Sequence, residues 1–293
     1  MTRITVAGGR WAAADNLIRA LTGLEVKVRV LTQNPRQAYE IYGKGSVEFV
    51  GIDINDPLSL RVGFQDTDRA LLSSGIPEQP SRHDMALIDA AVQAGVPYLV
   101  NLSAGGDVAY NRRQSMSDWR SKTDDHLAAQ GILTTLIHPA ISLDAIFDVA
   151  ATFYQSGQWG GIASNGRAAL VDLRDVVSST VRVLLDGPKR HGGKIYQLTG
   201  PFAVSMGYLA DCLSENSGRQ VRYHHRTPDE QRAVFRQAGS PVPRIDGLLA
   251  QEALIRDGFY AAATTDVFNL IGRPACSAMS WVEEHFLLLN SGL

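Results

Sequence analysis

Short apolar segments alternate with amphipathic ones along the first half of the chain. The apolar segments predict six strands, and the stretches between them have the apolar spacing of helices. We place the strands at residues 4–7, 26–32, 47–53, 69–74, 98–103 and 133–137. Strands that alternate with helices are typical of a parallel sheet covered on both faces. The pattern therefore predicts an α/β fold with a Rossmann-like doubly wound parallel sheet.

The pattern changes at about residue 150. The elements that follow are shorter, with strands expected at 168–171, 194–198 and 221–225 among several helices. We therefore expect a Rossmann-like NAD(P)-binding-type domain over residues 1–150 and a smaller mixed α/β lobe over residues 151–293. No low-complexity linker separates the two, so we expect them to be interleaved in one compact body with a cleft between them.

The opening strand, turn, helix and strand have the layout that binds dinucleotides, where three glycines of the turn admit the pyrophosphate. Gly8 occupies the first glycine position, but Trp11 and Ala14 replace the other two. An indole at the second position would fill the space that the phosphates take. Alanine at the third is a milder change, because that position mainly sets helix–strand packing. The layout predicts a nucleotide-binding fold, whereas the turn leaves nucleotide binding open.

Composition narrows the classes of function. The 293-residue chain is 45% hydrophobic and has a formal net charge of -2, which gives no electrostatic footprint for nucleic acid. Cys212 and Cys276 lie in unrelated segments without metal-ligand spacing, so we expect no metal site and no disulfide. No apolar run approaches the roughly 20 residues of a membrane span, and no signal-peptide pattern opens the sequence. We expect a soluble cytoplasmic protein that is a monomer or a homodimer.

A series of short motifs gives the chain a specific resemblance. Two of the longer ones are VEFVGIDIND at 47–56 and HDMALIDAA at 83–91. The others lie at 72–74, 94–96, 102–103, 130–132, 171–176, 196–201 and 270–273. In this order they resemble the NmrA-like group of atypical short-chain dehydrogenases, which includes bacterial NADPH:quinone oxidoreductases of the second type. That group contains reductases, redox-sensing regulators and natural-product tailoring enzymes, so the resemblance does not fix the function.

The resemblance implies positions for an NADP(H) cofactor. The matching residues are Gly8, Arg10, Trp11, Gln33, Asp53, Ile54, Ser73, Ser74 and Gly75. Gln33 stands where the family carries a basic residue for the 2′-phosphate, and Arg10 or Arg36 lies nearby to replace it. Asp53 and Ile54 match the pair beside the adenine. The changes at Trp11, Ala14 and Gln33 leave open whether NADP(H) binds.

The candidates for catalysis are few. The related dehydrogenases use a tyrosine with a lysine four residues later, and Tyr110 is followed at that distance by a glutamine. The catalytic candidates are therefore Ser103 at a strand end, Lys122 near a helix start and His138 before a proline. An imidazole at His138 would exchange protons near neutral pH, and the alternative is a partly buried histidine bonded to backbone. For an aromatic substrate we expect a pocket lined by Ile76, Tyr110, Trp119 and Phe147.

Three functions are compatible with these features. In the first, an NmrA-like oxidoreductase or tailoring enzyme acts on a quinone or polycyclic aromatic, polyketide-like substrate in the cleft, as in antibiotic biosynthesis, with NADPH as hydride donor if it binds. In the second, a cofactor-independent isomerase, cyclase or coupling enzyme uses His138 and Ser103 as acid and base. The third is a non-catalytic redox sensor or regulator. The missing Tyr–Lys pair favours the last two over an ordinary dehydrogenase, whereas the altered glycine turn disfavours nucleotide sensing.

Overall fold

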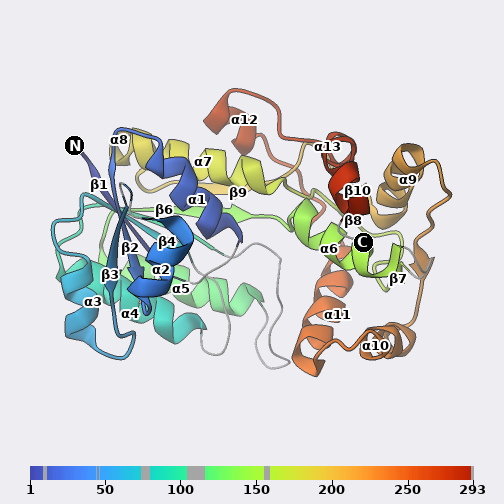
Figure 1. Ribbon diagram of the computed structural model, residues 1–293, viewed down its shortest axis with the longest axis horizontal. Coiled ribbons are helices and arrows are strands. Elements are labelled where there is room, and N and C mark those ends of the chain that lie inside the picture. The colour runs from blue at the N-terminus through green and yellow to red at the C-terminus, as the bar shows by residue number, and fades with distance from the viewer. Residues whose placement is uncertain are drawn as a thin grey trace. The chain divides into compact units, whose positions relative to one another are not determined.

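The computed structural model describes residues 1–8, 12–43, 45, 47–73, 80–103, 116–154 and 159–291 (Figure 1). Its main feature is a seven-stranded sheet of order β3-β2-β1-β4-β5-β6-β9. The strands are β1 (Arg3–Gly8), β2 (Lys27–Thr32), β3 (Val47–Gly51), β4 (Arg69–Ser73), β5 (Leu99–Leu102), β6 (Thr134–Pro139) and β9 (Ile195–Leu198). The predicted α/β fold with a doubly wound parallel sheet is confirmed.

The central strands are buried on both faces, which is why they read as continuous apolar segments. β1 and β2 pair in parallel with Ile4 opposite Val28 and Val6 opposite Val30, and none of these four exceeds 9% exposure. The strand order reverses between β1 and β4: β2 and β3 continue to one side, and β4, β5 and β6 to the other. In sheets of this type, ligands bind outside the carboxyl ends of the strands at such a reversal.

A seventh strand, β9, lies beside β6. The backbone N–H of Leu136 donates to the carbonyl of Lys194 at 3.0 Å and that of Ala140 to the carbonyl of Leu198 at 2.8 Å, so the two strands run in the same direction. We predicted this strand but assigned it to the C-terminal lobe. Its side chains alternate between exposed and buried, as suits the edge of a sheet. Alternation alone does not tell which sheet an edge strand joins.

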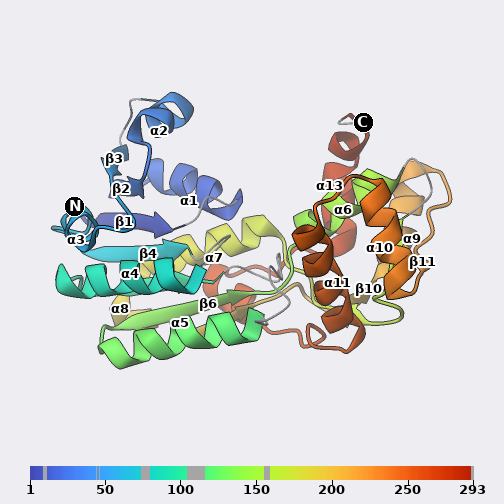
Figure 2. The same cartoon turned by 90° about the horizontal axis from the view of Figure 1, so that it is seen from below.

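Helices cover both faces of this sheet (Figure 1 and Figure 2). On one face lie α1 (Ala12–Thr22) and α7 (Leu173–Asp186), and on the other α3 (Pro57–Gly63), α4 (Pro80–Gln93) and α5 (Met116–Gln130). Leu87 and Ile88 of α4 and Leu127 of α5 join buried side chains of the strands in one hydrophobic core. Two shorter helices, α2 (Pro35–Tyr42) and α8 (Pro188–His191), follow strand β2 and helix α7 along the chain.

The chain divides into two compact units, and each consists of several segments. The first comprises Met1–Ala104, Ser117–His138 and Val177–Tyr196, and the second comprises Gly105–Met116, Pro139–Val176 and Gln197–Leu293. This division differs from a single boundary at residue 150, because the chain passes between the units several times. Residues 177–196 return to the first unit with most of α7, all of α8 and the start of β9.

The second unit is mostly helical. Its helices are α6 (Leu143–Tyr154), α9 (Met206–Ser217), α10 (Pro228–Gln237), α11 (Val242–Arg256), α12 (Asp266–Ile271) and α13 (Ala278–Ser291). Two small sheets accompany them: β8 (Arg167–Ala168) with β10 (Val204–Ser205), and β7 (Gly160–Gly161) with β11 (His224–His225). The lobe thus has the mixed α/β character predicted for it.

Phe147 belongs to the hydrophobic core of the second unit. Its ring stacks on Trp281 with centroids 4.7 Å apart and 6° between the planes, and the side chain is 1% exposed. We expected Phe147 to line a substrate pocket. The observed environment is that of a packing residue, whose flat contact with an indole stabilises α6 against α13.

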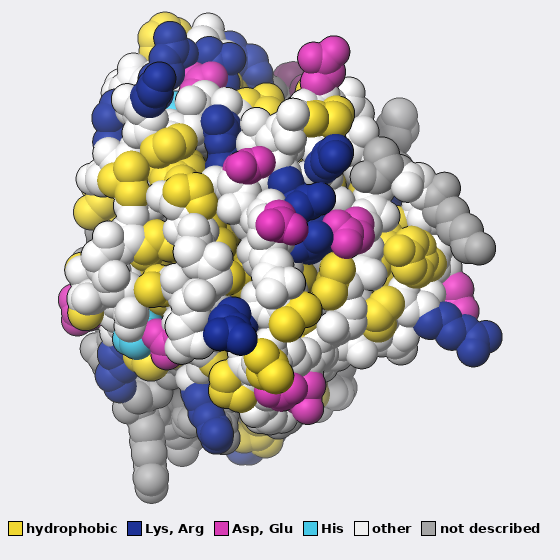
Figure 3. Space-filling view, turned by 90° about the vertical axis from the view of Figure 1, so that its left-hand side faces the viewer, with side chains coloured by type: hydrophobic (Ala, Val, Ile, Leu, Met, Phe, Trp, Pro, Cys, Tyr) yellow, Lys and Arg dark blue, Asp and Glu magenta, His cyan; other side chains and the backbone are white. Residues whose placement is uncertain are grey.

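The surface shown in Figure 3 carries both signs of charge. Lysine and arginine side chains lie interspersed with aspartate and glutamate on this face, without gathering into one patch among the residues drawn in colour. Within the described ranges, no helix is both long enough and apolar enough to cross a membrane.

Candidate functional site

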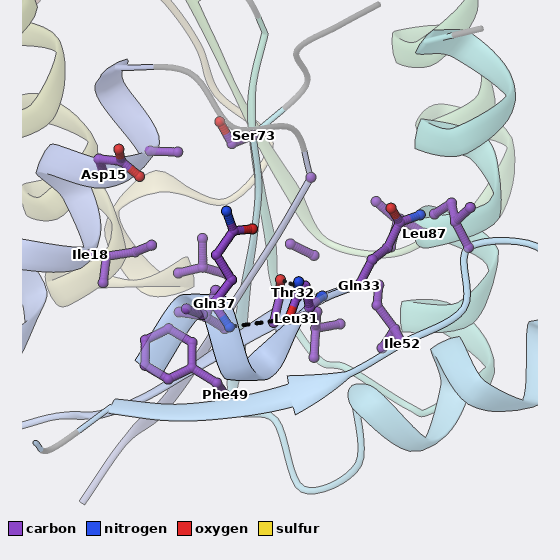
Figure 4. A pocket seen from close by; sticks show the side chains of 18 of the residues that line it. Asp15, Ile18, Leu31, Thr32, Gln33, Gln37, Phe49, Ile52, Ser73 and Leu87 are labelled. Atoms are coloured by element: carbon purple, nitrogen blue, oxygen red, sulfur yellow. Dashed lines mark hydrogen bonds between the residues drawn. The ribbon is translucent and has the colours of Figure 1, made fainter. Parts of the chain in front are cut away.

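A cavity of about 530 Å³ lies in the first unit at the carboxyl ends of the strands (Figure 4). Its wall comes from β1, β2, β3 and the segment after it, β4, and helices α1, α2 and α4. Gly8 at the end of β1 and Ser73 at the end of β4 are register partners, and both line the cavity. The cavity therefore lies at the reversal of strand order, where sheets of this type bind their ligands. Its volume is in the ordinary range of small-molecule sites.

Gly8 is required by the backbone at the cavity wall. Its φ is +120°, and a Cβ on this residue would lie 2.2 Å from the carbonyl oxygen of Ser73. Only glycine adopts this conformation without strain, and only glycine lets the two strand ends approach so closely. The prediction that Gly8 has a special role at the turn thus acquires a physical reason.

One side of the cavity is apolar and aromatic. Tyr42 of α2 stacks on Phe49 of β3 with centroids 5.5 Å apart, and both rings line the cavity. The Tyr42 hydroxyl donates a hydrogen bond to Asp15 of α1. The apolar part of the lining is completed by Val6, Ala7, Ala14, Ile18, Val30, Leu31, Ala38, Ile41, Ile52, Ile54 and Leu87. Such a surface suits a flat, uncharged ring.

The polar side is built where β2 passes into α2. Asn34 caps α2, since its side-chain oxygen accepts from the backbone N–H of Gln37 at 3.1 Å, and Pro35 occupies the first turn. The hydroxyl of Thr32 accepts from the backbone N–H of Asn34 at 3.2 Å. This tight turn places Thr32, Gln33, Asn34 and Gln37 on the cavity wall (Figure 4). The sequence signal for it is the Asn–Pro pair, a common start of a helix.

Asp53 lies beside this site rather than in its wall. The Asp53 side chain is exposed, and its carboxylate accepts from the backbone N–H of Asn55 at 2.9 Å. Its own N–H donates to the hydroxyl of Ser59 at 3.0 Å. The next residue, Ile54, does line the cavity. Of the predicted cofactor positions, Gly8, Gln33, Ile54 and Ser73 are therefore brought together, whereas Arg10, Trp11, Ser74 and Gly75 lie outside the described residues, as does Ile76 of the predicted substrate set.

His138 and Ser103 end two neighbouring strands, as predicted. His138 is 6% exposed, and its Nε2 lies 3.1 Å from Oδ2 of Asp124 on α5. The other oxygen of Asp124 accepts from the amide of Asn101 at 3.5 Å. The Ser103 hydroxyl donates to the carbonyl of Ile137 at 3.2 Å. A buried imidazole beside a carboxylate is an arrangement that can hold and transfer a proton.

The other predicted site residues are dispersed. Lys122 is exposed on α5, and none of the described residues that line the cavity belongs to this helix. Tyr110 lies outside the described residues, and so does the side chain of Trp119. Among the described residues, no group of three His, Cys, Asp or Glu side chains is placed to hold a metal ion. His138 is thus the predicted catalytic residue with a charged partner in the structure.

The sequence matches a family model described as "NmrA-like family" over residues 1–251. The chain belongs to the NmrA-like family. The resemblance inferred from its motifs is therefore confirmed.

The chain is similar to curated relatives and to solved structures over nearly its full length. The chain is 24% identical over 282 residues to the NAD(P)H azoreductase of Xenophilus azovorans, covering 96% of this chain and 97% of that one. It is 25% identical over 294 residues to quinone oxidoreductase 2 of Escherichia coli K12, covering 99% and 100%. The crystal structure of an NADPH-dependent quinone oxidoreductase of Escherichia coli, complexed with NADPH, superposes with a TM-score of 0.86 at 24% identity, covering 97% and 99%. At this identity the structural likeness establishes the shared fold.

Sequence reasoning missed three polar residues of this NmrA-like protein. Asp124 belongs to a helix whose polar positions look solvated, and only the packing of α5 beside β6 brings it to His138. Asp15 and Asp84 both line the cavity, and Asp84 is 6% exposed. Acidic residues near helix starts are usually read as favourable to the helix dipole, so nothing in the sequence separates these two from ordinary surface carboxylates.

Proposed function

We propose that this protein is an NAD(P)H-dependent reductase of a quinone or polycyclic aromatic compound. The observation that carries the proposal is the cavity at the reversal point between β1 and β4, with Gly8 and Ser73 in its wall. The similarity to an azoreductase and to a quinone oxidoreductase supports a small aromatic electron acceptor. When bound, the nicotinamide dinucleotide would supply the hydride.

The residues present suit the adenosine half of such a dinucleotide. The apolar side beside Ile18, Leu31 and Ile54 would accept the flat base, and the turn at Thr32 and Gln33 offers hydroxyl and amide groups to a ribose. Ala14, which replaces a glycine of the usual turn, is 6% exposed and lines the cavity. Ala14 and Gln33 are two of the three departures from the usual dinucleotide motif. Both line the cavity, so neither fills it.

His138 is our candidate for the donor of the proton that must accompany hydride transfer to a quinone. The carboxylate of Asp124 at 3.1 Å would orient the imidazole. Ser103, whose hydroxyl already donates to Ile137, is a weaker candidate for the same step. The assignment depends on the chemistry of the His138–Asp124 pair and on its place at the carboxyl end of β6.

Titration of the protein with NADH and NADPH tests the proposed function directly. We expect saturable binding by calorimetry or by nicotinamide fluorescence well below about 1 mM, and consumption of the bound dinucleotide when a quinone is added. Absence of binding up to that concentration would rule out hydride transfer, and Trp11→Gly would then show whether Trp11 blocks the site. Conversion of an aromatic substrate without either dinucleotide would instead support the cofactor-independent alternative.

Replacement of His138 by asparagine should lower kcat with quinone by at least about tenfold, because general acid catalysis contributes 10²–10⁴-fold where it operates. The affinity for the dinucleotide should stay within about twofold of wild type, since the change is confined to proton transfer. His126→Asn is the matched control: His126 also faces a carboxylate, Asp89 at 2.7 Å, but on the helical surface of the unit. Equal kcat in the two variants would exclude His138 from the reaction.

A further inference from the structure

The charged groups in the cavity wall are nearly all acidic. The described lining contains the carboxylates of Asp15 and Asp84, the imidazole of His83, and the amides of Gln33, Asn34 and Gln37. No lysine or arginine is found among the described residues of the lining. An anionic group that entered this space would meet two carboxylates and no permanent positive charge from these residues.

Three arginines on β2, α1 and α2 each have a partner in the structure. Arg36 of α2 has a side chain that is 91% exposed and pairs with Glu40 at 3.4 Å. Arg29 of β2 binds Glu48 at 2.9 Å and two backbone carbonyls. Arg19 of α1 lies over the ring of Tyr42, a residue of the cavity wall, 5.4 Å from its centroid, and is not itself part of the lining. Arg29 would have to leave Glu48 and both carbonyls before it could reach a phosphate in the cavity.

NADPH differs from NADH by one phosphate on the adenosine ribose. In dinucleotide folds that ribose lies near the end of the second strand, where an arginine accommodates the 2′-phosphate and a hydrogen-bond acceptor binds the 2′-hydroxyl. Here that place is taken by the exposed amide of Gln33 and by Asn34, both in the cavity wall. A neutral amide can accept a hydrogen bond from a hydroxyl. It stabilises a phosphate much less than a charged guanidinium does.

From this lining we infer that the protein selects NADH over NADPH, and that Gln33 sets the selection. The inference rests on the proposed function, because it concerns which form of the dinucleotide the cavity holds. It makes the turn at residues 32–34 a specificity-determining segment. The two carboxylates contribute by repelling the additional phosphate, whose charge at neutral pH is close to -2.

Calorimetric titration with both dinucleotides tests the inference by affinity, independently of turnover. We expect wild-type protein to bind NADH at least about fivefold more tightly than NADPH. Gln33→Arg should raise the affinity for NADPH about tenfold, equal to about 1.4 kcal/mol, while the affinity for NADH changes less than about twofold. The gain should decrease at high salt, because it is electrostatic. Gln65→Arg adds the same charge at an exposed position outside the lining and should change neither affinity.

The possible outcomes separate the two proposals. If neither dinucleotide binds, the proposed function fails. If wild type binds NADPH as tightly as NADH or more so, the proposed function stands and the selection for NADH is wrong. In that case Arg10→Gln identifies the cation by weakening NADPH binding alone. If Gln33→Arg leaves the affinity for NADPH unchanged, Gln33 does not set the selection.

Discussion

Gly8→Ala is expected to weaken dinucleotide binding strongly and to destabilise the protein by at least about 3 kcal/mol. The added Cβ would lie 2.2 Å from the carbonyl oxygen of Ser73, and this contact involves backbone on both sides. The φ of +120° adds strain of its own, since an alanine rarely adopts it. The strand ends must therefore move apart, and the cavity wall that both residues form moves with them.

The measurements are urea unfolding and titration with NADH. We expect at least about a hundredfold loss of affinity, which corresponds to about 2.7 kcal/mol. Gly23→Ala is the control, because a Cβ at Gly23 meets nothing within 4 Å. This variant should stay within about 0.5 kcal/mol of wild type and bind NADH normally. Wild-type affinity in Gly8→Ala would show that the end of β1 does not contact the dinucleotide.

Most of the first unit could be predicted from apolar periodicity and turn residues. Strands buried on both faces give continuous apolar segments, and a parallel sheet with these connections has few possible orders. The membership of β9 could not be predicted in the same way. Its four residues carry the alternating pattern of any edge strand, and its hydrogen bonds to β6 join positions some 58 residues apart in the sequence, as from Leu136 to Lys194.

The candidate site could be predicted only in part. Gly8 and Gln33 occupy positions that a strand–turn–helix unit defines locally, so the sequence locates them. Asp124 meets His138 only through tertiary packing, and a helical aspartate carries no sign of such a partner. Phe147 shows the opposite case, since an aromatic residue near an expected cleft suits a ligand or a core equally well. Here it stacks on Trp281 in the core of the second unit.

A partly buried carboxyl group in the second unit should make stability depend on pH. Glu252 of α11 accepts a hydrogen bond from the backbone N–H of Ile162 at 2.6 Å. It lies with the Tyr223 hydroxyl against Gly161, where a Cβ would come within 2.4 Å of both groups. Burial raises the pKa of Glu252 to about 7, although the bond from Ile162 and the charge of Arg226 oppose the rise.

The direction of this pH dependence follows from the protons that the folded and unfolded states bind. Between about pH 4.5 and pH 7 the folded state holds the Glu252 proton more tightly than the unfolded state does, so this group makes unfolding easier as the pH rises through that range. Below the range its carboxyl is neutral in both states and costs nothing. Above the range the cost is constant, about 3 kcal/mol for the full shift and about 2 kcal/mol once partial exposure is allowed for.

Glu252→Gln should therefore stabilise the protein by about 2 kcal/mol at pH 8 and by less than about 0.5 kcal/mol at pH 4. The amide oxygen still accepts from Ile162, so the variant removes the charge and keeps this contact. Urea unfolding at several pH values, followed by the fluorescence of buried Trp159 and Trp281, measures the difference. Glu283→Gln, at an exposed position on α13, should give a plot of unfolding free energy against pH that is parallel to that of wild type. If Glu252→Gln also runs parallel, then the carboxylate of Glu252 is ionised at no cost and the second unit holds it in contact with water.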